Sequence, residues 1–317
     1  MPDQPTLIFG LVALVGSGLA GVRPQVALGR RARARHNRGM AVVTPEGLAR
    51  FRADGFLALE GVFDDAACDA LRTRAAELVE GFDADSHRSI FTTDEQARRT
   101  DDYFLDSAER IHFFFEAEAF DEQGRLRQAK AQSINKIGHA LHDLDPVFAA
   151  FSRAPAVAAL VAAAGLPEPV LLQSMLIFKQ PRIGGAVTCH QDSTFLHTVP
   201  ERVLGLWVAL EDATIDNGCL WVLPGGHREG LRSRFVRRER ATHTVVLDPS
   251  PWDESKLVPV PAKKGTVILL DGLVPHASHA NRSAVSRQAY TLHLISARDA
   301  YPDSNWLQRT TPARGFA

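Results

Sequence analysis

Two histidines and one aspartate in the second half of the chain have the residue types and spacing of a metal site. His190 and Asp192 form an H-x-D pair at the end of a run of strand-forming residues. Residues i and i+2 of a strand point to the same side, so we expect both side chains to face the same space. His276 follows another such run, TVILLDG. Two imidazoles and one carboxylate suit non-haem Fe(II), because they cover one face of its coordination sphere and leave positions open for a cosubstrate and O2.

An arginine completes this pattern. Arg287 lies eleven residues after His276, at the start of another predicted strand. A buried guanidinium can form a bidentate pair with a carboxylate. 2-Oxoglutarate needs such a partner for its far carboxylate, since its keto-acid end would chelate the iron. The absence of cysteine from this set argues against a structural zinc site. The combination therefore predicts a site for Fe(II) and 2-oxoglutarate.

Other histidines offer alternatives. His279 lies three residues beyond the preferred distal ligand and is its main rival. His139 and His142 are three residues apart on a predicted helix, but no carboxylate completes a motif around them, so we expect hydrogen-bonded or surface histidines. His227 is expected to order a loop. His293 lies within a predicted strand and is expected to be a core histidine with its hydrogen bonds satisfied.

The first half of the chain has mostly helical patterns. Thr44 is a suitable N-cap for a short helix that Gly55 ends. Residues 64–82 place apolar side chains on one helical face. Residues 133–165 are predicted to form two helices, with Lys136 on the first. Between them, residues 83–130 are polar with a cluster of phenylalanines, which suggests an irregular segment that forms a lid.

The pattern changes at Pro167. From there to about residue 296, short strand-like runs alternate with turns, which is typical of an all-β sandwich or barrel. There is no G-x-G-x-x-G motif after a strand, no P-loop and no internal repeat. We therefore predict a mainly β fold with flanking helices, in which an N-terminal helical layer packs on an antiparallel core.

Composition narrows the function classes. The 317 residues are 45% hydrophobic and 23% charged, which excludes a disordered chain, a collagen-like repeat, a coiled coil and a polytopic membrane protein. The formal charge of −1 gives no indication of a nucleic-acid partner. The three cysteines match neither a zinc nor a disulfide framework, so we expect free thiols and a cytoplasmic location.

The N-terminus differs from the rest of the chain. Residues 6–22 are apolar and uncharged, and six arginines follow them before residue 40. This segment is either the product of an upstream start codon, a real membrane anchor, or another kind of tail; membrane contact is expected only for the anchor. Met40 begins a stretch that is typical of a soluble domain. We therefore divide the chain into an extension, residues 1–39, and one domain, residues 40–317.

From about residue 44 to residue 306, the chain resembles the phytanoyl-CoA dioxygenase family of Fe(II)/2-oxoglutarate oxygenases. The matching stretches are NKIGHALHDLDPVF, QSMLIFKQPRIGG, HQDSTFL, RVLGLWVALEDAT, NGCLWVLPGGH and SRQAYTLHL followed by NWLQ. The resemblance implies a double-stranded β-helix (jelly-roll) core with iron held by His190, Asp192 and His276. It also implies 2-oxoglutarate contacts from Lys136, Met175, Gln191, Trp207, Ser278 and Arg287.

The family's chemistry sets the expected reaction. It is hydroxylation of a small-molecule or lipid-like substrate with O2, releasing succinate and CO2, and ascorbate is expected to support turnover in vitro. Asp192 favours hydroxylation over halogenation, because relatives that halogenate replace this carboxylate with a small residue. PGGH stands where the family often has PGSH, and the loop after HQDSTFL is one residue shorter, which bears on the substrate side. The alternatives are a catalytically silent jelly-roll binding module and another cupin-type metal enzyme. The substrate and the oligomeric state are not predicted.

Overall fold

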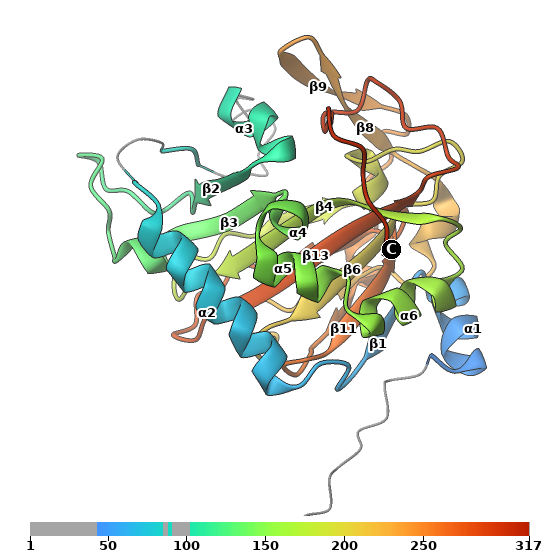
Figure 1. The fold of residues 1–317 in the computed structure, drawn as a ribbon, viewed down its shortest axis with the longest axis horizontal. Helices are drawn as coiled ribbons and strands as arrows, with labels where there is room; N and C mark the ends of the chain where they lie inside the picture. Colours follow the sequence, from blue (N-terminus) through green and yellow to red (C-terminus); the bar gives the residue numbers. More distant parts are fainter. Residues whose placement is uncertain (1–42, 85–87, 91–101, 317) are drawn as a thin grey trace, which may run out of the picture. The chain divides into compact units, whose positions relative to one another are not determined.

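The computed structural model describes residues 43–84, 88–90 and 102–316, and the predicted extension, residues 1–39, lies outside them. Two antiparallel sheets form the core (Figure 1). The larger sheet contains, in spatial order, β1 (Phe56–Leu59), β11 (Val267–Asp271), β6 (Leu204–Ala209), β13 (Arg287–Ser296), β4 (Pro169–Lys179), β3 (Ile134–His139) and β2 (Ile111–Phe115). The smaller sheet contains β10 (Val258–Val260), β7 (Leu220–Val222), β12 (His276–Ser278) and β5 (Val187–His190). The hairpin of β8 (Ser233–Arg238) and β9 (Ala241–Val246) forms a separate ribbon. The predicted mainly β core is confirmed.

Helices cover one face of the larger sheet (Figure 1). This layer consists mainly of α2 (Asp65–Gly81), α5 (Pro146–Ser152) and α6 (Pro155–Ala164). The other helices are α1 (Pro45–Asp54), α3 (Asp102–Asp106) and α4 (Leu141–Leu144). Short 3-10 turns follow at η1 (Ser107–Glu109), η2 (Lys130–Gln132), η3 (Asp192–Thr194), η4 (Gly226–Glu229) and η5 (Glu254–Lys256).

Local sequence signals explain where the first helices begin and end. Thr44 Oγ1 accepts a hydrogen bond from the Gly47 amide at 3.1 Å, and Gly55 ends α1 with φ of 81°, a conformation that favours glycine. Asp64 caps α2 in the same way, through the Ala67 amide at 2.9 Å. The buried face of α2 consists of Cys68, Leu71, Ala75 and Val79, and it packs on the core between helices and sheet. The predicted short helix after Thr44 is therefore confirmed.

The prediction of a helix at the start of residues 133–165 was wrong. This segment begins with β3, which pairs with β2 on one side and β4 on the other, and only α4, α5 and α6 follow as helices. All six residues of β3 are buried, and a short buried strand cannot be told from a helix by hydrophobic period alone. Lys136 and His139 therefore lie on a strand.

The predicted irregular segment, residues 83–130, is only partly irregular. Its described part contains α3, η1 and β2, and β2 is an edge strand of the larger sheet. The Phe114 and Phe115 side chains of β2 are buried. Backbone pairing with β3 supplies order that the polar sequence around β2 does not indicate.

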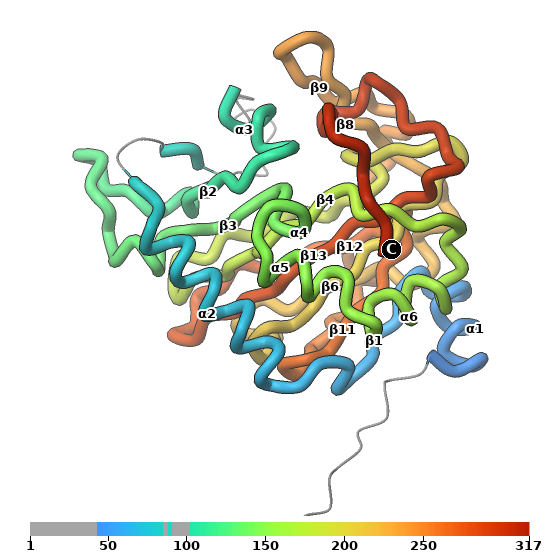
Figure 2. Tube along the Cα trace, viewed as in Figure 1, coloured from blue at the N-terminus to red at the C-terminus, as the bar shows by residue number. Residues whose placement is uncertain are grey.

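The C-terminal segment returns over the helical face of the larger sheet (Figure 2). The Leu171 amide donates to the Arg314 carbonyl at 3.0 Å, and the Arg153 guanidinium donates to the Gly315 carbonyl at 3.1 Å. Within the described residues no single helix has the length and apolarity to cross a membrane; the bent pair of α5 and α6 meets those two criteria only when its members are taken together.

Candidate metal centre and cosubstrate cavity

The two candidate histidine ligands come from neighbouring strands of the smaller sheet. His190 is the last residue of β5 and His276 the first of β12, and the antiparallel register pairs them directly. Their ring centroids lie 4.3 Å apart. His276 had been expected in a turn after a strand; it instead begins a three-residue strand between β5 and β7. Pairing across the sheet thus brings together two residues that are far apart in the sequence.

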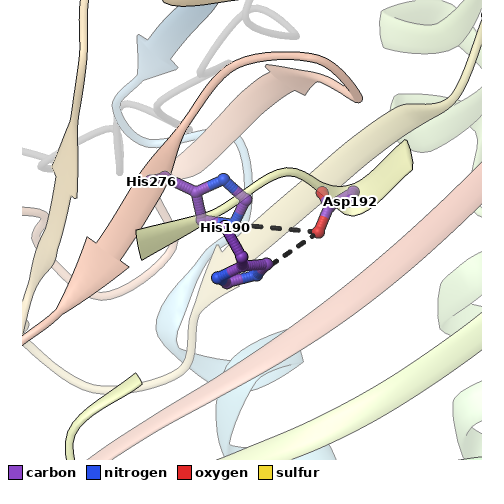
Figure 3. Close-up of side chains that lie close together, drawn as sticks. All are labelled: His190, Asp192 and His276. Carbon is purple, nitrogen blue, oxygen red and sulfur yellow. Dashed lines mark ion pairs between the residues drawn. The ribbon is translucent and has the colours of Figure 1, made fainter. Parts of the chain in front are cut away.

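Asp192 completes the group from the turn η3 that follows β5. Its Oδ1 lies 3.7 Å from Nε2 of His190 and 3.7 Å from Nε2 of His276, as Figure 3 shows. One ligand atom from each of the three residues lies within 4.8 Å of the others. The fold therefore brings the ligand atoms of the three predicted residues close together.

Backbone carbonyls orient both imidazoles. Nδ1 of His190 donates to the Thr188 carbonyl at 2.9 Å, and Nδ1 of His276 donates to the Val274 carbonyl at 3.1 Å. A carbonyl oxygen only accepts, so each Nδ1 carries the proton and each Nε2 presents a lone pair toward Asp192. This is the tautomer that metal coordination through Nε2 requires.

The Asp192 carboxylate is buried, with 7% of the residue exposed. Burial alone would raise its pKa, but His293, His276 and His190 together outweigh this and hold the pKa below its ordinary value. Within the described part of the chain, no Lys or Arg pairs with this carboxylate. An ionised carboxylate surrounded only by imidazoles fits a divalent cation, and this donor set suits Fe(II).

Arg287, the first residue of β13, presents a positive charge to the same space. It is 1% exposed, and its Nε donates to the Gly218 carbonyl at 3.1 Å. Its Nη1 is buried and has no hydrogen-bond partner among the described residues. Burial lowers the pKa of Arg287 to about 10, so the group stays protonated at neutral pH. A buried cation without an anion fits a carboxylate ligand.

The two charged centres line one cavity of about 200 Å³ between the sheets. Its lining includes five of the residues that the family resemblance predicts for 2-oxoglutarate, namely Lys136, Met175, Trp207, Ser278 and Arg287. Lys136 is 4% exposed, and its Nζ lies 5.1 Å from the ring centroid of Phe114. The guanidinium carbon of Arg287 lies 5.5 Å from the ring centroid of Trp207. The cavity thus places cationic groups beside the candidate metal centre.

Gln191 is not among the residues that line the cavity. Its amide nitrogen donates to the Gly230 and Leu273 carbonyls at 2.8 and 2.7 Å, and its amide oxygen accepts from the Arg232 amide at 3.0 Å. Alternation along the chain turns this side chain away from the face of its two neighbours. The structure gives Gln191 a positioning role for the surrounding loops, and its predicted contact with 2-oxoglutarate stays a prediction.

Sequence reasoning missed two residues near the site. His293 lies with Nε2 3.3 Å from Asp192 Oδ2, where a satisfied core histidine had been expected. Lys179 is buried, and its Nζ donates to the carbonyls of Gly185, Ser278 and His279 at 2.5, 3.3 and 2.9 Å. The available sequence signal for Lys179 was its position at the end of the apolar run VLLQSMLIFK.

The rival histidines lie elsewhere. The His279 ring stacks on Trp221 with centroids 4.6 Å apart, and it does not belong to the group around Asp192. His227 Nε2 lies 3.2 Å from the Arg52 carbonyl, which agrees with the expected role in ordering a loop. Trp306 lines the cavity.

Comparison with known proteins identifies relatives of this chain. The family model described as phytanoyl-CoA dioxygenase matches residues 51–289. Phytanoyl-CoA dioxygenase domain-containing protein 1 from Rattus norvegicus is 47% identical, over 86% of this chain and 97% of the relative. Phytanoyl-CoA dioxygenase 1 from Oryza sativa subsp. japonica is 46% identical, over 85% of this chain and 95% of the relative. These matches confirm the predicted resemblance.

Solved structures share the fold. EctD from S. alaskensis, solved with 2-oxoglutarate and 5-hydroxyectoine, has a TM-score of 0.56 and 22% identity, covering 82% of this chain and 78% of that one. SnoK, described as a non-heme alpha ketoglutarate dependent carbocyclase from nogalamycin biosynthesis, has a TM-score of 0.56 and 18% identity, covering 82% and 87%. These likenesses confirm the predicted fold class.

Proposed function

This chain belongs to the phytanoyl-CoA dioxygenase family, and from that premise we propose that it hydroxylates a small-molecule or lipid-like substrate. The reaction uses Fe(II), 2-oxoglutarate and O2 and releases succinate and CO2. Family membership makes the chain an oxygenase. The observation that carries the finer proposal is one cavity lined both by a buried carboxylate among imidazoles and by a buried guanidinium without an anion.

His190, Asp192 and His276 are the proposed ligands of the iron. Their Nε2, Oδ1 and Nε2 atoms converge, and the histidine tautomers are already set by backbone carbonyls. Bound Fe(II) supplies the chemistry that couples oxidative decarboxylation of 2-oxoglutarate to insertion of oxygen into a substrate C–H bond. The protein's contribution is to hold the reactants in register and to exclude water. The Asp192 carboxylate supports hydroxylation over halogenation.

The cationic residues of the cavity are the proposed partners of 2-oxoglutarate. Arg287 and Ser278 bind its far carboxylate, and Lys136 binds its keto-acid end. Each of these three side chains is buried and lines the cavity. Met175 and Trp207 form walls beside them. The dianion 2-oxoglutarate suits this cavity, because Arg287 and Lys136 are buried cations that can pair with its two carboxylates with little competition from water.

The test is succinate formation from 2-oxoglutarate by the purified full chain with Fe(II), ascorbate and O2. Arg287→Ala is expected to weaken 2-oxoglutarate binding by more than about a hundredfold, because a desolvated charge-assisted pair is lost, while Fe(II) binding is kept. Arg282→Ala is the matched control, since Arg282 lies five residues away, is exposed and pairs with Glu118.

The outcomes separate the alternatives. Fe(II) and 2-oxoglutarate binding without succinate formation under any substrate screen would indicate a silent binding module. Fe(II) binding with equal 2-oxoglutarate affinity in wild type and Arg287→Ala would refute the cosubstrate assignment and favour another cupin-type metal enzyme.

The domain and location remain parts of this proposal. Residues 40–317 form the dioxygenase domain and residues 1–39 an extension, which the N-terminal mass of the native protein tests. A cytoplasmic location is supported by three free cysteines, and burial raises the pKa of Cys68 to about 11, which keeps its thiol protonated. Subcellular fractionation tests the location; recovery with membranes would contradict it.

A further inference from the structure

One side of the cavity is built from aromatic side chains. This aromatic wall consists of Phe104, Phe114, Phe195, Phe235 and Trp306, all of which line the cavity. Phe104 stacks on Trp306 with centroids 4.4 Å apart, and the Phe195 ring meets the His190 ring edge-on at 5.9 Å. The wall therefore reaches the candidate metal centre, where a substrate C–H bond has to lie.

His139 lies within this wall. It is the last residue of β3, it is 1% exposed, and it also lines the cavity. Its ring centroid lies 5.1 Å from that of Trp306 and 5.9 Å from those of Phe104 and Phe114. It thus places a polar ring inside a surface that is otherwise apolar.

Hydrogen bonding fixes the tautomer of His139. Ser107 Oγ donates its proton to the Phe104 carbonyl at 2.5 Å, and the same Oγ lies 2.7 Å from His139 Nδ1. A hydroxyl has one proton, so Ser107 can only accept from Nδ1, which must carry the imidazole proton. Burial lowers the pKa of His139 well below its ordinary value, so the ring is neutral. Nε2 therefore offers a lone pair.

The hydrogen bond between the His139 ring and Ser107 uses Nδ1, which leaves the Nε2 lone pair for a ligand in the cavity that the ring lines. The described lining of the cavity contains only two Lys or Arg side chains, Lys136 and Arg287, and both are assigned to 2-oxoglutarate. An acidic substrate group beside the aromatic wall would have to share Lys136, whose Nζ lies 5.1 Å from the Phe114 ring centroid, with 2-oxoglutarate. A hydrogen-bond donor would find the acceptor Nε2, and an apolar skeleton would find the aromatic faces.

We propose that the part of the substrate that enters the cavity is uncharged, with a ring or branched carbon skeleton packed on the aromatic wall and a hydroxyl or N–H group donating to His139 Nε2. This inference rests on the proposed function, because it assigns the cationic side of the same cavity to 2-oxoglutarate. His139 would then select for a donor group and against its methylated or ionised counterpart. A site built to pair with a substrate OH or NH rejects analogues that lack it.

Calorimetry on the full chain, loaded with Mn(II) and 2-oxoglutarate, tests this with three probes of one skeleton. They are 2-naphthol, 2-methoxynaphthalene and 2-naphthoate. We expect 2-naphthol to bind about tenfold more tightly than the methyl ether, through one added hydrogen bond, and the carboxylate to bind most weakly. His139→Phe keeps an aromatic ring but removes the acceptor, so the preference for 2-naphthol should disappear. His243→Phe, on exposed β9, is the matched control.

Ser107→Ala provides a second variant that leaves the imidazole in place. It removes the acceptor for Nδ1, so His139 can move its proton to Nε2, and the preference for 2-naphthol should fall. Equal affinities for 2-naphthol and its methyl ether in the wild type, or an unchanged preference in both variants, would overturn the proposal. Failure of 2-oxoglutarate to bind would instead refute the proposed function, because that binding is measured separately before any probe is added.

Discussion

Two clusters of this protein each combine an aspartate with histidine, yet in only one of them does the protein supply cations that pair with the carboxylate. Asp143 Oδ1 pairs with Arg153 and Arg314 at 2.8 Å each, and Oδ2 pairs with Arg309 at 2.6 Å. Asp192 has only imidazoles around it within the described residues. The carboxylate of the first cluster is paired with arginines of the protein itself, whereas the carboxylate of the second requires a cation from outside.

The same contrast holds for the arginines. Arg309 donates from Nη2 to Asp143 and from Nη1 to the Leu172 carbonyl at 3.1 Å. Arg287 is buried with Nη1 unpaired. A buried charge left uncompensated costs several kcal/mol, so a protein retains one where a ligand will compensate it. A buried charge that lacks an oppositely charged partner in the protein, rather than residue type, therefore distinguishes the functional cluster.

Removing one histidine from each cluster gives the largest expected difference. His190→Ala should weaken Fe(II) binding by more than about a hundredfold and abolish succinate formation, since it deletes a proposed ligand. His142→Asn should leave both properties unchanged, because the amide can keep the hydrogen bond that His142 Nδ1 makes with Ser174 Oγ at 2.9 Å. Metal titration and succinate assays measure the two effects. Loss of iron in His142→Asn would reverse the assignment of the clusters.

Removing the two aspartates should separate stability from binding. Asp143→Ala leaves a group of arginines without their anion, so the free energy of unfolding should fall by about 3 kcal/mol, with Fe(II) affinity kept. Asp192→Ala removes an uncompensated buried charge, so the metal-free protein should lose little stability or gain some. Urea unfolding of the metal-free full chain measures both. Equal destabilisation by the two substitutions would contradict the comparison.

The stability of the structural cluster should depend on pH through His142. Burial lowers the pKa of His142 to about 4 from an ordinary value of 6.5. The unfolded chain therefore binds this proton first, so stability is lost as pH falls through 6.5 toward 4 and is present above 6.5. Lowering the pH from about 7 to about 5 should therefore reduce the free energy of unfolding by about 2 kcal/mol through this group. Urea unfolding at several pH values should show a smaller loss for His142→Asn, and an equal loss would contradict this origin.

The sequence predicted the candidate metal centre more completely than its surroundings. The H-x-D spacing was sufficient to place His190 beside Asp192, although β5 ends at His190 and Asp192 lies on the turn η3. Family resemblance supplied most of the residues that line the cosubstrate side. The helix predicted over Lys136 failed because β3 takes its conformation from strands at distant sequence positions. The partners of Asp143 could not be predicted from the sequence either, since Arg309 and Arg314 approach it from the C-terminal segment.

His139 and His293 show the same limit. His139 was expected to be a hydrogen-bonded or surface histidine and His293 a core histidine, and nothing in their local sequence says which buried group each one faces. His139 faces the cavity because Ser107, on the preceding turn, holds its Nδ1. His293 faces Asp192 because β13 pairs with β6, which places it opposite Gly205. Pairing between distant strands, rather than local pattern, determines these roles.

The smallest expected effect tests how the incomplete cluster is held. A Cβ at Gly205 would lie 3.0 Å from Asp192 Oδ2, so this glycine lets the carboxylate pack closely against β6. His293 Nε2 lies 3.3 Å from the same oxygen, which leaves Oδ1 directed at His190 and His276. We expect His293 to be a positioning residue, since an imidazole beside the outer oxygen of a ligand carboxylate helps to fix its orientation.

His293→Leu should weaken Co(II) binding by about tenfold and change the visible absorption of the bound Co(II), because Asp192 loses a fixed orientation. His293→Gln carries an amide near the position of Nε2 and should restore both readouts, which repacking of the core alone would not achieve. His243→Leu, on the exposed strand β9, is the matched control. If Leu and Gln at position 293 give the same affinity and the same spectrum, Asp192 is held by packing against Gly205 rather than by His293.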